Sequence, residues 1–263
     1  MIDSHCHLDD AIFDADRGVA WERARAAGVT HAIVPGVEPR TWSRTELCAL
    51  PGERSIALGI HPQALADLTH DDIRLALDEL TGRARREAVV AIGECGLDGG
   101  TDLQRAPMTL QREVFLAHVE IARSLDRPLI VHVLRAHAEA LETLRGAKLR
   151  SPAGVIHSYS GSAEMVDAYV QIGFFISFAG GITRPRARKP FESARRVPDD
   201  RLLIETDAPG QIPTGAVPPD VARPRCEPAH LGLTRDAVAS ARGVHGDEVD
   251  RLTTANARRL FRI

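Results

Sequence analysis

The sequence predicts an α/β protein of the TIM (β/α)8 barrel class, and three observations support this fold. Eight short apolar segments recur along the chain, helical patterns lie between them, and the length of 263 residues suits such a barrel. Strands that alternate with helices indicate βα units and a parallel sheet. Eight such units favour a closed barrel over an open, doubly wound sheet. We expect one barrel domain over residues 1–263.

The eight expected strands are apolar or β-branched and too short for helices, as buried parallel strands should be. In chain order they are Ile2–Cys6, Ala32–Val34, Ile56–Ile60, Val89–Ile92, Leu129–Val133, Val155–Ile156, Phe174–Phe178 and Leu202–Ile204. The clearest helix is Leu110–Leu125, where apolar residues recur at spacings of three and four. Another helix is expected to follow Ser162 as its N-cap. Gly28 and Gly173 stand where helices should end.

The composition argues against several classes of protein. Apolar residues make up 44% and charged residues 26%, with no run of the roughly 18 to 20 apolar residues that cross a bilayer. We find no signal peptide and expect a cytoplasmic protein without a membrane partner. The four cysteines lack C-x-x-C spacing, and we expect reduced thiols. A net charge of −3 means that any contact with nucleic acid needs a local basic patch.

Ionisable side chains stand at the carboxyl ends of six of the eight expected strands, which face the active site in a barrel of this class. They are His5, His7, His61, Glu94, His132, His157, Glu205 and Asp207. Unpaired charges are costly to bury, so packing alone does not explain six such ends on one rim. A shared metal ion removes that cost, and the pattern therefore predicts a metal site.

The spacing of these residues favours two divalent ions. His5 and His7 lie two residues apart in an extended strand, so both imidazoles face inward. Glu94 is flanked by glycines that allow a close approach of backbone and metal, and we predict that it bridges the ions. Two ions about 3.5–4 Å apart activate a water, whose proton Asp207 would accept. A carboxylated lysine is excluded as the bridge, since neither Lys148 nor Lys189 lies at a strand end.

Six short motifs surround these residues: IDSHCHL at 2–8, GIHP at 59–62, AIGECGLD at 91–98, IVH at 130–132, HSYSG at 157–161 and ETDAP at 205–209. Together they resemble the TatD family of metal-dependent hydrolases, from Met1 to about Arg262. The segment GGITRPRARK at 180–189 is similar to its YjjV-type branch. The resemblance implies an amidohydrolase-like barrel with metal ligands at His5, His7, Glu94, His132, His157 and Asp207. Members known as deoxyribonucleases imply phosphodiester hydrolysis, often exonucleolytic, with magnesium or a similar ion.

The chain departs from the family pattern at positions expected to contact substrate. Leu134 stands where family members often have arginine, and Gly99 and Gly100 stand where aromatic residues are usual. The family's R-N-x-P loop reads RCEP at 225–228, without its asparagine. Since the expected metal ligands are intact, these departures concern the substrate. We predict substrate contacts at His61, Arg184, Arg186 and Arg225.

Other polar residues receive different expectations. Two roles remain open for His61, which either positions a substrate phosphate or is a structural histidine. Glu205 is expected to support the metal ligands. His137 is expected to begin a helix. Five histidines are expected on helices, at helix starts or in loops, without a role in the site: His31, His70, His118, His230 and His245. A basic cluster after the seventh strand begins on the catalytic face and could follow a phosphate backbone, whereas Arg83, Arg85 and Arg86 lie on the opposite face.

The leading function is hydrolysis of phosphodiester bonds in DNA ends or short single strands, with no obligate protein partner implied. Another ester or amide remains an alternative, such as an aminoacyl-tRNA ester, a small phosphate ester or a cyclic amide, because metals polarise phosphoryl and carbonyl oxygens alike. An inactive scaffold would be favoured by a lost ligand, and every expected ligand is present. Magnesium, manganese and zinc all remain open.

Overall fold

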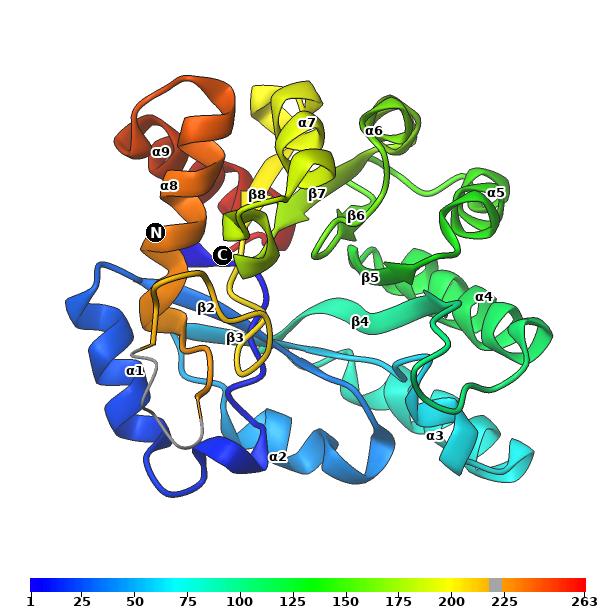
Figure 1. Ribbon diagram of the computed structural model, residues 1–263. Helices are drawn as coiled ribbons and strands as arrows, with labels where there is room; N and C mark the ends of the chain where they lie inside the picture. Colours follow the sequence, from blue (N-terminus) through cyan, green and yellow to red (C-terminus); the bar gives the residue numbers. More distant parts are fainter. Residues whose placement is uncertain (218–223) are drawn as a thin grey trace.

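The computed structural model describes residues 1–217 and 224–263, and it has the eight parallel strands that the sequence predicts (Figure 1). The strands are β1 Ile2–Asp3, β2 His31–Gly36, β3 Arg54–Leu58, β4 Val89–Asp98, β5 Leu129–Leu134, β6 Gly154–Ile156, β7 Phe174–Phe178 and β8 Leu202–Ile204. Each strand pairs in parallel with the next along the chain. Backbone bonds from Ser4 N to Ile204 O (3.2 Å) and from Asp207 N to His5 O (2.9 Å) join the first and last strands. The sheet is therefore a nearly closed barrel.

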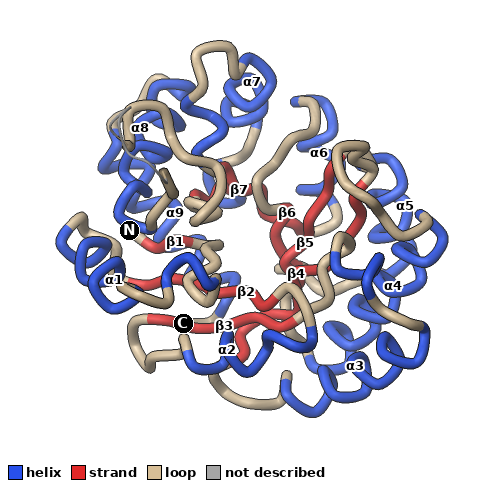
Figure 2. Tube along the Cα trace, turned by 60° about the horizontal axis from the view of Figure 1, so that its bottom comes forward, coloured by secondary structure: helices blue, strands red, loops and turns tan. Residues whose placement is uncertain are grey.

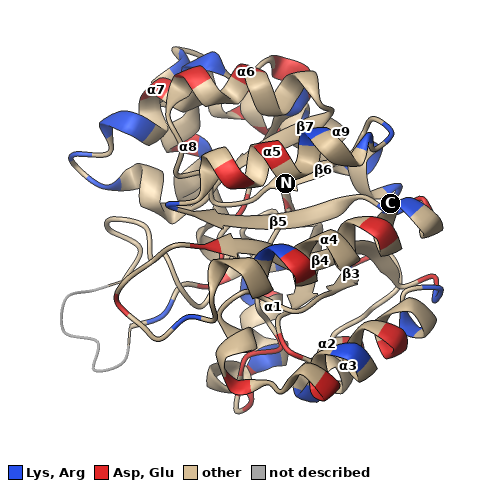
Figure 3. Ribbon diagram, turned by 90° about the vertical axis from the view of Figure 1, so that its right-hand side faces the viewer, with Lys and Arg blue, Asp and Glu red and all other residues tan. Residues whose placement is uncertain are grey.

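The helices surround the strands, as Figure 2 shows with helices in blue and strands in red. They are α1 Arg17–Ala26, α2 Trp42–Leu47, α3 His70–Arg83, α4 Met108–Leu125, α5 His137–Ala147, α6 Ala163–Gln171, α7 Arg188–Arg196, α8 Leu231–Arg242 and α9 Gly246–Phe261. Ser162 is the N-cap residue of α6, as predicted, and His137 begins α5. Most Lys, Arg, Asp and Glu residues lie on these helices and the loops (Figure 3). No helix of the described ranges is both long and apolar enough to cross a membrane.

Strand β4 is longer than the sequence predicts, and two glycines make this possible. Gly93 and Gly96 have φ values of 137° and 138°, which side chains of L-residues rarely adopt. A Cβ at Gly93 would collide with the carbonyl of Ile130, and one at Gly96 with the carbonyl of His132. The close approach is therefore between the backbones of β4 and β5, which brings Glu94 beside His132.

The barrel interior has an apolar layer beneath the ionisable residues. Side chains two residues apart on a strand share a face. Ile130 therefore shares a face with His132, Val155 with His157, and Leu203 with Glu205. These three apolar residues belong to one fully buried cluster, with Ile33 and Phe175 among its other members. The packed layer supports the polar residues at the carboxyl ends of the strands.

Two of the histidines expected outside the site are structural parts of the barrel. His31 was expected on a helix or in a loop, and that expectation is wrong, because it begins β2 and its Nε2 lies 3.0 Å from Ser55 Oγ. His118 lies on α4, as expected, and is fully buried. Its Nε2 accepts a hydrogen bond from Ile60 N at 2.9 Å, and its Nδ1 donates to Val114 O at 2.7 Å. His118 is therefore neutral in the fold.

His118 is expected to make the protein less stable in acid. Burial lowers its pKa to about 4, against 6.5 for an exposed histidine. As the pH falls from about 6.5 to about 4, the unfolded chain takes a proton that the fold excludes, so the stability present above pH 6.5 is lost. In EDTA, the stability advantage of the wild type over His118→Gln should shrink by about 2 kcal/mol between pH 7.5 and 5, measured by urea unfolding. An advantage that stays constant would contradict the assignment.

Candidate metal centre

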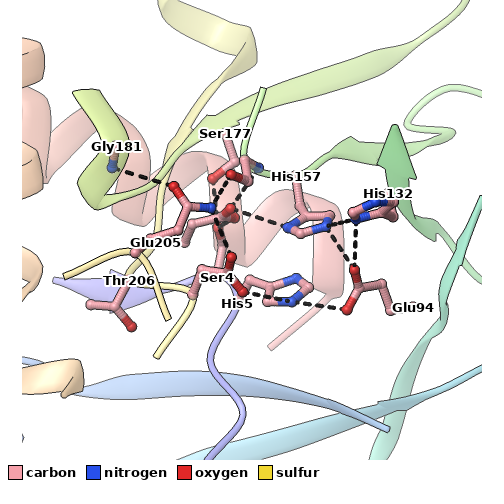
Figure 4. A network of polar contacts seen from close by, with 12 residues as sticks. Ser4, His5, Glu94, His132, His157, Ser177, Gly181, Glu205 and Thr206 are labelled. Atoms are coloured by element: carbon pink, nitrogen blue, oxygen red, sulfur yellow. Dashed lines mark hydrogen bonds and ion pairs between the residues drawn. The ribbon is translucent and has the colours of Figure 1, made fainter. Parts of the chain in front are cut away.

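The carboxylate of Glu94 lies among five histidines at the carboxyl ends of the strands. Figure 4 shows it beside His5, His132 and His157. Its Oε2 is 3.3 Å from His5 Nε2 and 3.5 Å from His7 Nε2. Its Oε1 faces three other imidazole nitrogens, at 3.1, 3.3 and 2.8 Å, which belong to His61, His132 and His157. The two oxygens of Glu94 thus face two different groups of histidines.

Asp207 completes the first of these two groups. Its Oδ1 lies 3.7 Å from His5 Nε2 and 3.5 Å from His7 Nε2. Among the described residues, three sets of donor atoms are close enough together to hold an ion: His5, His7 and Asp207; Glu94 with His61 and His132; and His5 with His157 and Glu205. The predicted ligands come together as two half-sites that share Glu94.

The imidazole nitrogens fit a bound cation. His5 Nε2 and His7 Nε2 are 3.1 Å apart, and His132 Nδ1 and His157 Nε2 are 3.3 Å apart. Each imidazole nitrogen carries either one proton or one lone pair, so two nitrogens at these distances need a proton between them or a cation that both lone pairs can bind. Imidazole and carboxylate are ligands that zinc and manganese accept, and carboxylates also suit magnesium. The residues therefore match a divalent metal site.

The electrostatics of this centre favour ionised carboxylates. Burial alone would raise the pKa of Glu94, but His157, His61 and His5 outweigh it and hold that pKa well below its usual range. The pKa of Asp207 is likewise lowered, because the hydrogen bond from His7 outweighs burial. Burial opposes charge on His157 as well, yet Glu94 and Glu205 raise its pKa well above the usual value. Binding of a cation would therefore release a proton from His157.

Glu205 supports His157 from behind, as the sequence predicts for it. Its Oε1 lies 3.4 Å from His157 Nδ1 and accepts a hydrogen bond from Ser158 N at 2.6 Å. Its Oε2 accepts from Ser4 Oγ at 3.2 Å, and the residue is fully buried (Figure 4). These contacts turn the other nitrogen of His157, Nε2, toward Glu94.

Asp98 supports His132 in the same way, and the sequence analysis gave it no role. Its Oδ2 lies 3.3 Å from His132 Nε2 and accepts from Gln63 Nε2 at 2.7 Å. Its Oδ1 accepts from Gly100 N at 2.7 Å and lies 3.1 Å from Arg105 Nε. The alternation of β4 could have found Asp98, because it shares a strand face with Glu94 four residues earlier.

Gln211 holds Asp207 in place. Its Nε2 donates to Asp207 Oδ2 at 2.8 Å and also to Ser158 Oγ, while its Oε1 accepts from Gly181 N at 3.3 Å. Asp207, Ser158 and Gln211 all have left-handed backbones, with φ values of 53°, 44° and 44°. Such backbones cost about 1–3 kcal/mol each and persist where surrounding contacts fix them. The Gln211 side chain provides such contacts and leaves Asp207 Oδ1 directed at His5 and His7.

The family model described as TatD related DNase matches residues 2–262. The chain belongs to the TatD family. It is 33% identical over 264 residues to the uncharacterized metal-dependent hydrolase YabD of Bacillus subtilis, covering 100% of this chain and 99% of that protein. It is 34% identical over 265 residues to the 3′-5′ ssDNA/RNA exonuclease TatD of Dickeya dadantii, covering 100% and 98%. The crystal structure of YjjV, a TatD homologue from Escherichia coli K12, matches with a TM-score of 0.90 at 30% identity, covering 100% of this chain and 98% of that one.

The family relationship confirms the predicted resemblance and makes the protein a TatD-type metal-dependent hydrolase. A cavity of about 750 Å³, which we call the metal cavity, opens at the candidate metal centre. Six of the predicted residues line it: His7, His61, Glu94, His132, His157 and Asp207. His5 is fully buried beneath them. Leu134 also lines this cavity, and so does Arg105, a cation that the sequence analysis did not single out.

Arg225, for which we predicted a substrate contact, forms a network of ion pairs in this TatD-family protein. Its Nη2 lies 2.6 Å from Asp16 Oδ2 and 2.9 Å from Glu227 Oε1. Its guanidinium stacks 4.4 Å from the centre of the Phe13 ring, and it does not line the metal cavity. Arg225 therefore joins the loop before α8 to the start of α1 and is not among the described residues that line the metal cavity.

Replacing Arg225 with alanine is expected to lower stability and spare substrate binding. Loss of its charged hydrogen bonds should lower the free energy of unfolding by about 1–3 kcal/mol. KM should remain within about twofold of the wild-type value, because the site loses no contact. Thermal unfolding and steady-state kinetics measure the two effects. A rise in KM of tenfold with unchanged stability would restore the substrate role.

Proposed function

We propose that this TatD-family hydrolase cleaves phosphodiester bonds at the ends of single-stranded DNA. The observation that carries the proposal is the Glu94 carboxylate, with one oxygen directed at each of two groups of metal-binding side chains. A relative of comparable length that is 34% identical is named a 3′-5′ ssDNA/RNA exonuclease, which supports a nucleic-acid substrate. Both features fit hydrolysis of a phosphodiester.

Two sets of residues would hold divalent ions, which we expect to be magnesium, manganese or zinc. The first is His5, His7, Glu94 and Asp207, and the second is Glu94, His132 and His157. When bound, such ions lower the pKa of a coordinated water and neutralise charge on the phosphoryl oxygens. Glu205 and Asp98 keep His157 and His132 turned toward this space.

Asp207 and His61 act on the substrate and the attacking water. The hydrogen bond from Gln211 occupies Asp207 Oδ2, so Oδ1, which faces His5 and His7, is the oxygen that would accept the proton of the water. His61 Nδ1 accepts a hydrogen bond from Gln63 N at 3.1 Å, so a neutral imidazole carries its proton on Nε2. Burial lowers the pKa of His61 to about 4, which keeps the ring neutral at physiological pH. Its Nε2 lies 3.1 Å from Glu94 Oε1 and is a donor that a phosphate oxygen in the cavity would share with Glu94.

A second candidate is hydrolysis of another ester or an amide, which the charge of the metal cavity favours. Arg105 is the one Arg or Lys among the described residues that line it. That arginine is already paired, at 3.1 Å from Asp98 Oδ1 and 3.2 Å from Asp102 Oδ1. The cavity itself thus holds little free positive charge for a polyanion, as suits a small or uncharged substrate.

The test removes bound metal, restores magnesium, manganese or zinc singly, and adds end-labelled single-stranded DNA. We expect metal-dependent shortening of the labelled strand, and no shortening with Glu94→Ala. A parallel assay uses a small chromogenic phosphodiester and a carboxylate ester. Hydrolysis of a small ester with intact DNA would reject the nuclease proposal in favour of the second candidate.

A further inference from the structure

A second cavity, of about 1160 Å³, lies between the segment that follows β7 and helices α7 and α8. We call it the arginine cavity, because its lining includes Arg184, Arg186, Arg188 and Arg195. The first three are exposed, and no carboxylate of the described ranges lies within ion-pair distance of them. Figure 3 shows the loop that carries them, in blue, projecting on the side where β5 ends. These cations are available to a ligand on the catalytic face.

The arginine cavity also has an apolar part. Phe191 is half-buried in its wall, and Leu233 of α8 is 37% exposed beside it. Single-stranded nucleic acid is bound by positive charge along the backbone together with aromatic rings on which bases stack. Glu192 also lines the cavity, so its charge is not uniformly positive. The combination of three exposed arginines with an aromatic side chain matches a nucleotide better than it matches a simple anion.

The arginine cavity and the metal cavity adjoin residues of, or bonded to, the same short turn. It is the 3-10 turn Gly180–Thr183, which at about 2 Å per residue is roughly 8 Å long. Gly181 N donates to Gln211, which lines the metal cavity, whereas Thr183 Oγ1 accepts from Thr214 N at 2.8 Å, and both threonines line the arginine cavity. One strand of a few nucleotides can therefore reach from one cavity to the other.

We propose that the arginine cavity binds nucleotides of the substrate strand beyond those at the metal centre. Arg184, Arg186 and Arg188 contact phosphates, and Phe191 stacks on a base. This inference rests on the proposed nuclease function and supplies the positive charge that the metal cavity lacks. It predicts that long strands use the arginine cavity, whereas a small phosphodiester does not.

The test compares a triple variant, Arg184→Ala/Arg186→Ala/Arg188→Ala, with a control of equal charge change, Arg85→Ala/Arg145→Ala/Arg150→Ala. The control arginines are also exposed, and each lies near the end of a helix or between it and the next strand, on the opposite face. Binding of fluorescent dT12 is measured by anisotropy in EDTA over a salt series. We expect affinity at least tenfold weaker for the first variant, with a slope of log K against log salt smaller by about 2, since each phosphate contact contributes about 0.7.

A second measurement distinguishes a site for nucleic acid from a site that binds any polyanion. Phe191→Leu keeps apolar volume but removes the stacking face, so it should weaken dT12 binding about fivefold or more and leave binding of inorganic polyphosphate unchanged. Equal affinities and slopes for the two triple variants would overturn the proposal, as would equal effects of Phe191→Leu on both ligands. If the triple variant shows the predicted smaller slope but the wild type does not cleave DNA, the binding site stands and the nuclease function is rejected. If the wild type cleaves DNA but the two triple variants have the same slope, the nuclease function stands and the arginine cavity is rejected as a binding site.

Discussion

Replacing Glu94 with glutamine is expected to lower kcat/KM by about a thousandfold or more, because metal stabilisation of the transition state is worth several kcal/mol. The amide keeps the size of the side chain but has one oxygen and one N–H donor group. One of the two histidine groups would then face donor hydrogens where it now faces an oxygen 2.8–3.5 Å away. The protein should bind less metal and hydrolyse its substrate negligibly.

Steady-state kinetics and metal content by mass spectrometry check this prediction. Glu142→Gln is the matched control, since Glu142 is an exposed residue of α5 that makes the same change of charge away from the centre. The control should keep wild-type activity and metal content. If Glu94→Gln retained more than a tenth of the activity with full metal content, the bridging role of Glu94 would be wrong.

Replacing Asp207 with asparagine is expected to lower kcat by about 10²–10⁴-fold, the usual contribution of a positioned general base. The asparagine oxygen can still accept the hydrogen bond from Gln211 Nε2, so the loop should keep its conformation. Its amide group would then face His5 and His7, which removes the proton acceptor from the space beside them. The loss should appear in kcat more than in KM, because the substrate keeps its other contacts.

A pre-steady-state measurement separates this effect from a general loss of structure. Thermal unfolding of Asp207→Asn in EDTA should lie within a few degrees of the wild type, while the single-turnover rate falls with kcat. A variant that keeps kcat within tenfold of the wild type would exclude Asp207 as the proton acceptor. A parallel fall in stability and rate would assign it a structural role.

The fold and the two half-sites were predictable because both follow from the order of the strands. In a (β/α)8 barrel every strand ends at the same rim, so residues as distant in sequence as His5 and Asp207 meet once the strands are recognised. The period of two along each strand then decides which side chains face inward, as it does for His5 and His7. No knowledge of loops is needed for this step.

Residues on loops were predicted poorly, because their positions depend on distant partners. Arg225 is paired with Asp16, more than 200 residues away in the sequence, and no local pattern indicates that pair. Gln211 has a left-handed backbone although it is not glycine, which only the surrounding contacts explain. His31 lies next to a glycine-containing turn in sequence, yet the ladder with β1 extends β2 to include it.

Anomalous X-ray diffraction from crystals soaked in manganese would test the central claim most directly. The account predicts two peaks, one on each side of the Glu94 carboxylate: the first beside His5, His7 and Asp207, the second beside His132 and His157. Crystals of Glu94→Gln should lose at least one of them. A single peak that does not contact Glu94, or no peak among these residues at saturating manganese, would contradict the account.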